Sequence, residues 1–156
     1  MTLLLLQPLQ VGGKLPGLPP KRGRRTHRWI GILLIGSVLV HVIGLWLTSP
    51  PDVIDALLLR SPTPFSLWGV LAMWALFAAA LLGALRRRLR LRWRQWRFAH
   101  TFLGILVVAG SIAHALLIEG TMETTSKILL CILVLAATLK TYIDLRVWSR
   151  GTGPHV

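Results

Sequence analysis

Four long apolar stretches, separated by short polar segments, dominate the pattern of hydrophobic and polar positions along the chain. They cover about residues 27–47, 65–85, 98–118 and 126–145. An α-helix rises 1.5 Å per residue, so about 20 apolar residues cross the hydrocarbon core of a bilayer. The pattern therefore predicts an all-α fold, an integral membrane helical bundle with four transmembrane helices.

The segments outside these spans divide the chain into three parts. Residues 1–11 are apolar but too short to cross a bilayer, and Pro8 interrupts them, so we expect a helical stub or an interfacial segment. A linker rich in Gly and Pro follows and ends in a basic run. We expect a stub with its linker over 1–26, a membrane domain over 27–148 and a polar tail over 149–156. A short helix is also expected at about residues 53–59.

Charge distinguishes the two sides of the predicted bundle. The chain has 18 Lys and Arg against 5 Asp and Glu, a net charge of +13. Nucleic-acid binding is one interpretation of so basic a chain, but the basic residues flank apolar spans, as cytoplasmic loops of membrane proteins do. We therefore expect membrane lipid and no nucleic acid as a partner. The loop 86–97, with seven arginines, is predicted to be cytoplasmic.

Two pairs of histidines share one spacing. His27 and His41 lie 14 residues apart on the first span, and His100 and His114 lie 14 residues apart on the third. On an α-helix this separation is within roughly 40° of four full turns and rises about 21 Å. The first and third spans run in the same direction. The four imidazoles are therefore predicted to form two cross-helix pairs, His27 with His100 and His41 with His114, at two depths.

This arrangement suits two stacked haems. A porphyrin iron needs two axial ligands, and two facing imidazoles supply them without leaving a position for O₂. The single cysteine, Cys131, excludes a covalent c-type attachment, so two non-covalently bound haems are predicted. A bare metal site is less well matched, because no Cys, Asp or Glu accompanies the histidines. The remaining alternative is that the histidines only form hydrogen bonds within the bundle.

Glycine and arginine neighbours extend the predicted cofactor site. Gly31 and Gly104 each follow a histidine by one helical turn and would let a flat macrocycle approach the backbone; close helix packing is the alternative role. Arg28 and Arg97 could meet haem propionates, although ordinary positive-inside charge explains them equally well.

These residues resemble the ferric reductase-like transmembrane family, which includes the haem domains of ferric reductases and NADPH oxidases. The resemblance rests on the four histidines, on Trp96-Arg97-Phe98-Ala99-His100 and on His114-Ala115-Leu116-Leu117, and covers about residues 24–148. It implies a bundle with two bis-histidine b-type haems that carry electrons across the membrane. Family bundles usually have about six spans, so we expect that upstream helices are missing from this sequence.

The resemblance implies a function for residues 27–148 as a haem-binding domain. We expect a b-type cytochrome of the bacterial inner membrane, an oxidoreductase subunit within a reductase system. No flavin or NAD(P) site is expected in this chain, so a quinol or a separate flavoprotein would be the electron donor, with an acceptor on the outer side. The alternative function is a non-catalytic haem sensor or an assembly protein.

Overall fold

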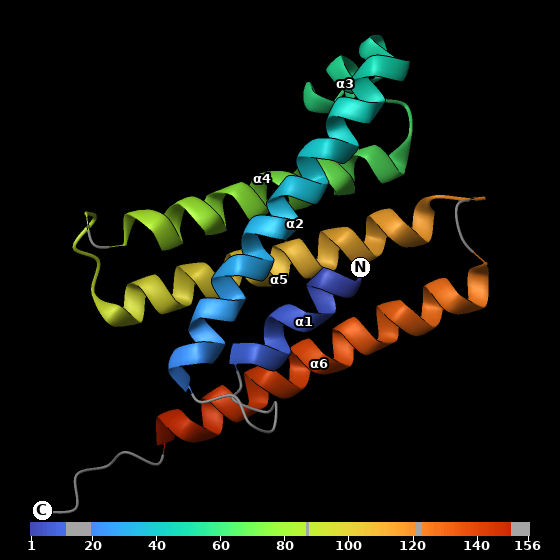
Figure 1. Ribbon diagram of the computed structural model, residues 1–156. Helices are drawn as coiled ribbons and strands as arrows, with labels where there is room; N and C mark the ends of the chain where they lie inside the picture. The colour runs from blue at the N-terminus through green and yellow to red at the C-terminus, as the bar shows by residue number, and fades with distance from the viewer. Residues whose placement is uncertain (12–19, 87, 121–122, 151–156) are drawn as a thin grey trace, which may run out of the picture. The chain divides into compact units, whose positions relative to one another are not determined.

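The computed structural model of the protein describes residues 1–11, 20–86, 88–120 and 123–150 (Figure 1). Four of its helices are long and apolar enough to cross a membrane, over Arg22–Thr48, Pro64–Leu85, Trp93–Leu117 and Thr124–Asp144. The described residues are almost entirely helical. The predicted all-α architecture with four spans is confirmed. In order, the helices are α1 (Thr2–Val11), α2 (Pro20–Thr48), α3 (Pro50–Leu57), α4 (Pro64–Leu85), α5 (Trp93–Leu117) and α6 (Thr124–Arg150).

Several helices extend beyond the apolar stretches that predicted them. Helix α2 begins at Pro20 instead of residue 27, and α5 begins at Trp93 instead of residue 98. Arg and Lys are good helix formers, so a helix continues past the point where its sequence stops being apolar. Apolar content thus marks the part of a helix that fits the bilayer and not its ends. Proline, by contrast, marks the first residue of two helices, Pro50 in α3 and Pro64 in α4. The first turn of a helix has no intrahelical acceptor for its N–H groups, so the missing N–H of proline costs no hydrogen bond there.

The chain folds into two compact units. One contains residues 1–34 and 128–156, and the other contains residues 35–127, so α2 contributes to both. The predicted linker residues 12–19 and tail residues 151–156 lie outside the described residues.

In the unit of residues 35–127, α4 and α5 form an antiparallel hairpin (Figure 1). Small residues line the contact: Ala72, Ala75 and Ala79 of α4 are buried, as is Gly110 of α5. A Cβ atom built on Gly110 would lie 3.0 Å from both the Ala72 Cβ and the Trp68 backbone oxygen. Small side chains let two helix backbones approach closely in a membrane, where van der Waals contact drives association.

In the other unit, the apolar stub forms a helix. The Thr141 hydroxyl of α6 donates a hydrogen bond to the Pro8 backbone oxygen of α1 at 3.1 Å. Leu4 and Gln10 of α1 are buried, and Val134 of α6 is completely buried. Residues 1–11, expected as a helical stub or an interfacial segment, thus contain a helix with Pro8 inside it.

Candidate functional site

The two histidines of α5 are both held by backbone groups of α4. His114 Nδ1 lies 2.7 Å from the Phe65 backbone oxygen, and the ring of His100 is hydrogen-bonded to the backbone of Ala79. Phe65 and Ala79 are 14 residues apart, as are His100 and His114. In an antiparallel hairpin, one register therefore places both imidazoles at equivalent positions against the neighbouring helix. The repeated spacing in the sequence corresponds to a repeated contact in the structure.

The ring of His114 is packed as well as hydrogen-bonded. A Cβ built on Gly69 would lie 2.7 Å from Nδ1 and 2.8 Å from the ring Cε1 of His114. Real Cβ atoms essentially never make such contacts, so any larger residue at position 69 would require the imidazole to shift. The Phe65 ring meets the His114 ring edge-on, with centroids 6.0 Å apart at 63°. Three contacts with α4 thus fix the orientation of this side chain.

His100 is fixed by a different aromatic partner. The Trp96 ring, one helical turn earlier on α5, stacks on it with centroids 5.2 Å apart and planes within 12°. With the bond to Ala79, this contact defines the plane and the rotation of the imidazole. Each histidine of α5 therefore has one aromatic neighbour and one α4 backbone partner.

The two histidines of α2 belong to different units of the fold. His41 is exposed on the part of α2 that belongs to the unit of residues 35–127. His27 is partly buried in the other unit. The structure thus joins His100 and His114 through one helix hairpin, whereas the predicted pairs, His27 with His100 and His41 with His114, stay predictions.

The glycines and arginines of the predicted site are in varied surroundings. Gly31 faces α1, and a Cβ built on it would lie 3.5 Å from the Gln7 Nε2 atom, an ordinary contact. Gly104 is partly buried on α5, one turn after His100. Arg28 is exposed on α2, and Arg97 is partly buried on α5. Their roles toward a cofactor also stay predictions.

The donor set fits haem better than a bare metal ion. Within the described ranges, no three His, Cys, Asp or Glu side chains are grouped as a metal site would need. A haem iron needs only two axial nitrogens. Metal-ligating histidines usually donate their second ring N–H to a carbonyl or carboxylate, which fixes the tautomer. Donation from His114 Nδ1 to the Phe65 oxygen would leave Nε2 as the lone-pair nitrogen, as axial ligation requires.

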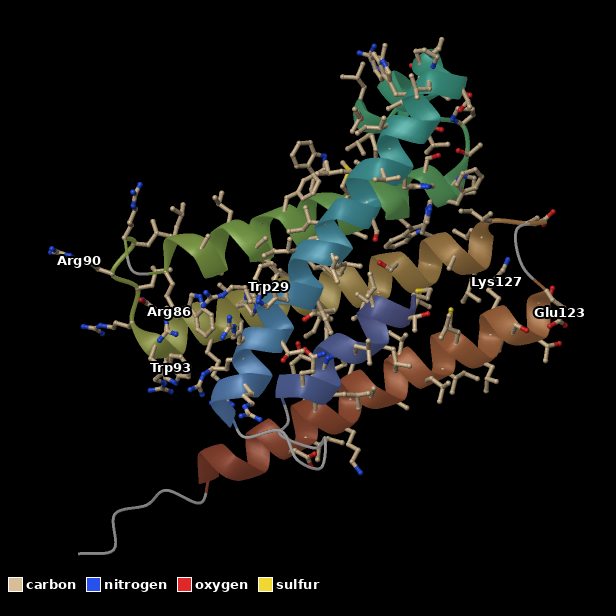
Figure 2. The ribbon with its side chains drawn as sticks, viewed as in Figure 1. Trp29, Arg86, Arg90, Trp93, Glu123 and Lys127 are labelled. Atoms are coloured by element: carbon tan, nitrogen blue, oxygen red, sulfur yellow. The ribbon has the colours of Figure 1, made fainter. Side chains whose placement is uncertain are left out.

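Two features of this hairpin were not predicted from the sequence. The carbonyl partners of the histidines carry no sequence signal, because nearly every residue has a backbone carbonyl. The second feature is a stack at the loop end of α4 and α5 (Figure 2), in which Arg86 lies over Trp93 and Trp96. The spacing of Trp93, Trp96 and His100 by three and four residues, which places them on one helix face, could have indicated it.

Comparison with known proteins gives one family. The sequence model of the family described as ferric reductase like transmembrane component matches residues 1–111, well over half of the chain. The matched range includes His27, His41 and His100 and ends three residues before His114. No curated protein and no solved structure is similar enough to the chain to count as a match. The family consists of transmembrane redox components that often bind haem.

Proposed function

The chain belongs to the ferric reductase-like transmembrane family, and on this basis we propose that it is a membrane b-type cytochrome that carries electrons across the bilayer. Two haem b groups would be held in its four-helix membrane domain. The observation that carries the proposal is the matched anchoring of His100 and His114, 14 residues apart, on backbone groups of α4 that are also 14 residues apart.

The ligand roles follow from the depths of the histidines along their helices. His27 and His100 would hold one haem, and His41 and His114 the other, at opposite ends of α2 and α5. When bound, a bis-imidazole haem iron supplies one-electron chemistry without an open site for O₂. Gly31 and Gly104 would admit the flat faces of the cofactors, and Arg28 and Arg97 would bind propionates through charge-assisted hydrogen bonds.

Contacts within the α4–α5 hairpin orient the imidazole rings of His100 and His114. The Phe65 oxygen holds the Nδ1 proton of His114, so Nε2 keeps its lone pair for a ligand. Gly69 gives this ring its space, and Trp96 holds the plane of His100. A rigid pair of imidazoles favours electron transfer, because little rearrangement of the protein accompanies each change of charge.

The position in the cell follows from the loop charges. We propose a multi-pass protein of a bacterial inner membrane, with the Arg-rich loop 86–97 in the cytoplasm. A quinol or a separate flavoprotein would reduce the protein on that side, and an acceptor on the outer side would oxidise it. The protein would thus be the oxidoreductase haem subunit of a reductase system.

Transmembrane electron transfer tests this function. The purified protein would be reconstituted into vesicles that contain trapped ferricyanide, and dithionite would be added outside. We expect loss of the ferricyanide absorbance at a rate that depends on the protein and falls to that of empty vesicles in His114→Ala. Bound haem without any such transfer would instead favour the haem-sensor alternative.

A further inference from the structure

The most unusual arrangement outside the histidine contacts is a stack of cationic and aromatic groups where α4 ends and α5 begins. The Arg86 guanidinium carbon lies 4.5 Å from the centre of the Trp93 ring and 4.4 Å from that of Trp96. The two indoles stack on each other at 5.3 Å with planes within 26°. Two indoles thus contact one guanidinium, which restricts its position before any ligand arrives.

A guanidinium held in this way remains a good ligand for an oxyanion. Its N–H groups lie in a plane and form a fork that matches two oxygens of a phosphate or carboxylate. Stacking on an aromatic ring uses the face of the group and leaves that edge for hydrogen bonds. Arg86 is exposed, so its edge is accessible.

No acidic side chain of the hairpin can occupy this fork. The sequence has no Asp or Glu between Asp55 and Glu119, whereas residues 86–97 include seven arginines. The stack therefore presents a positive charge with an exposed hydrogen-bonding edge that has no acidic partner within its own hairpin, so an anion from another molecule can bind there.

The loop around the stack indicates what that molecule is. Leu89 and Leu91 alternate with arginines and are 49% and 36% exposed, and Trp93 is 54% exposed. The stack also lies at the ends of two helices that are long and apolar enough to cross a membrane, where lipid headgroups are expected. Apolar side chains of this kind enter the acyl region while arginines stay among the phosphates. An acidic protein surface would leave them without an apolar environment.

We propose that Arg86, Trp93 and Trp96 form a binding site for the phosphate group of an anionic glycerophospholipid. Arg86 donates hydrogen bonds from its fork to two phosphate oxygens, the indoles hold Arg86 in place, and Leu89 and Leu91 contact the acyl chains. Negatively charged headgroups are preferred over phosphatidylcholine because they bring no competing cation. The site does not depend on haem.

The chain offers matched variants for a test. Arg86→Gln removes the stacked guanidinium. Trp93→Leu keeps every charge but removes half of the aromatic support. Arg90→Gln removes one charge from the same loop at a residue that projects away from Arg86 and Trp93 (Figure 2). Each protein would be purified in a neutral detergent, and phosphatidylglycerol, phosphatidylcholine or inorganic phosphate would be titrated with native mass spectrometry as the readout.

The wild-type protein is expected to bind one phosphatidylglycerol more tightly than phosphatidylcholine, and inorganic phosphate is not expected to displace it. Arg86→Gln should weaken this binding about 10-fold or more, as the loss of a charge-assisted pair does. Trp93→Leu should weaken it about fivefold although the net charge is unchanged. Arg90→Gln should have a smaller effect than either.

Two results would overturn the lipid site. Equal losses in Arg86→Gln and Arg90→Gln, with Trp93→Leu unchanged, would mean that only the total charge of the loop matters. Unchanged phosphatidylglycerol binding in Arg86→Gln would show that Arg86 does not bind the lipid. The remaining candidate for the ligand of Arg86 would then be an acidic protein surface. Because haem content is not measured, neither result bears on the proposed electron transfer.

Discussion

His114 Nδ1 lies 2.7 Å from the backbone oxygen of Phe65, a residue 49 positions earlier in the chain. This bond ties the last turn of α5 to the first turn of α4. Histidines that bind a metal through one ring nitrogen commonly donate the N–H of the other to a carbonyl oxygen. The Phe65 oxygen is such a partner for Nδ1, and Nε2 would then be the nitrogen that binds the proposed haem iron. The same antiparallel register joins His100 to Ala79 at the other end of the hairpin.

The close approach of Gly69 to His114 predicts the effect of one added methyl group. Gly69→Ala places a Cβ 2.7 Å from His114 Nδ1, so the ring or the helix backbone must shift, and we expect this shift to weaken the bond to the Phe65 oxygen. Overpacking of this kind typically costs about 1–3 kcal/mol. We expect a lower melting temperature in detergent and less haem per chain. Gly83→Ala on the same helix is the control, because a Cβ there would meet nothing within 4 Å. Equal behaviour of the two variants would mean that the His114 contact has no role in stability or in haem binding.

Trp96 is predicted to act as a positioning residue for His100. Loss of the stacked ring in Trp96→Ala frees the imidazole to rotate, because the Ala79 bond alone does not fix its plane. The proposed haem at His100 should then show broadened low-spin electron paramagnetic resonance signals. Trp96→Phe should restore narrow signals, since it keeps an aromatic face. Unaltered signals in Trp96→Ala would show that the stack does not orient His100.

Glu123 caps the N-terminus of α6 in a way that depends on pH. Its carboxylate accepts hydrogen bonds from the backbone N–H groups of Thr125 at 3.2 Å and Ser126 at 3.1 Å. The hydrogen bonds from the side chains and backbones of Thr125 and Ser126 lower the pKa of Glu123 from 4.5 to about 2. A lowered pKa means that the cap contributes fully above pH 4.5 and is lost as the pH falls toward about 2.

Amide hydrogen exchange can follow this cap. Protection of Thr125 and Ser126 should decrease as the pH falls through that window in the wild-type protein. Glu123→Gln should show low protection throughout and no such decrease, because the amide carries no charge to lose. A variant with the wild-type pH profile would exclude Glu123 as the titrating group.

The proposed orientation predicts opposite locations for two loops. Reporter fusions at Arg90 and Glu119 lie at the two ends of α5, in the basic loop and in the acidic one. We expect cytoplasmic reporter activity at Arg90 and periplasmic activity at Glu119, as the positive-inside rule requires. The reverse pattern would invert the topology and would place the donor side at the pair formed by His41 and His114.

The helices could be predicted because bilayer thickness imposes a length on apolar stretches. Those over residues 65–85 and 126–145 are found within α4 and α6. The ends of the helices were harder to predict from the sequence. Residues Arg22 to Thr26 are part of α2, although their composition is too polar to indicate a membrane span. The His27, His41, His100 and His114 spacing was readable because it reflects helical geometry alone.

The contacts of the histidines were not readable from the sequence. Which residue of α4 faces His114 depends on the register of the hairpin, and that register is set by small residues such as Gly69 and Gly110 together. The role predicted for Gly31 illustrates the same limit, because its neighbour in the structure is Gln7 of α1. Sequence spacing along one helix cannot identify the helix that covers a given face.

The most direct test of the central claim is the haem content of the detergent-purified protein. A pyridine haemochrome assay, with oxidised and dithionite-reduced optical spectra, would be applied to the wild-type protein and to the four single His→Ala variants. We expect about two low-spin haem b groups per chain, the same single haem lost in His41→Ala and His114→Ala, and the other lost in His27→Ala and His100→Ala. A wild-type protein without a Soret band would contradict haem ligation. Different losses within a pair would contradict the assignment of ligands.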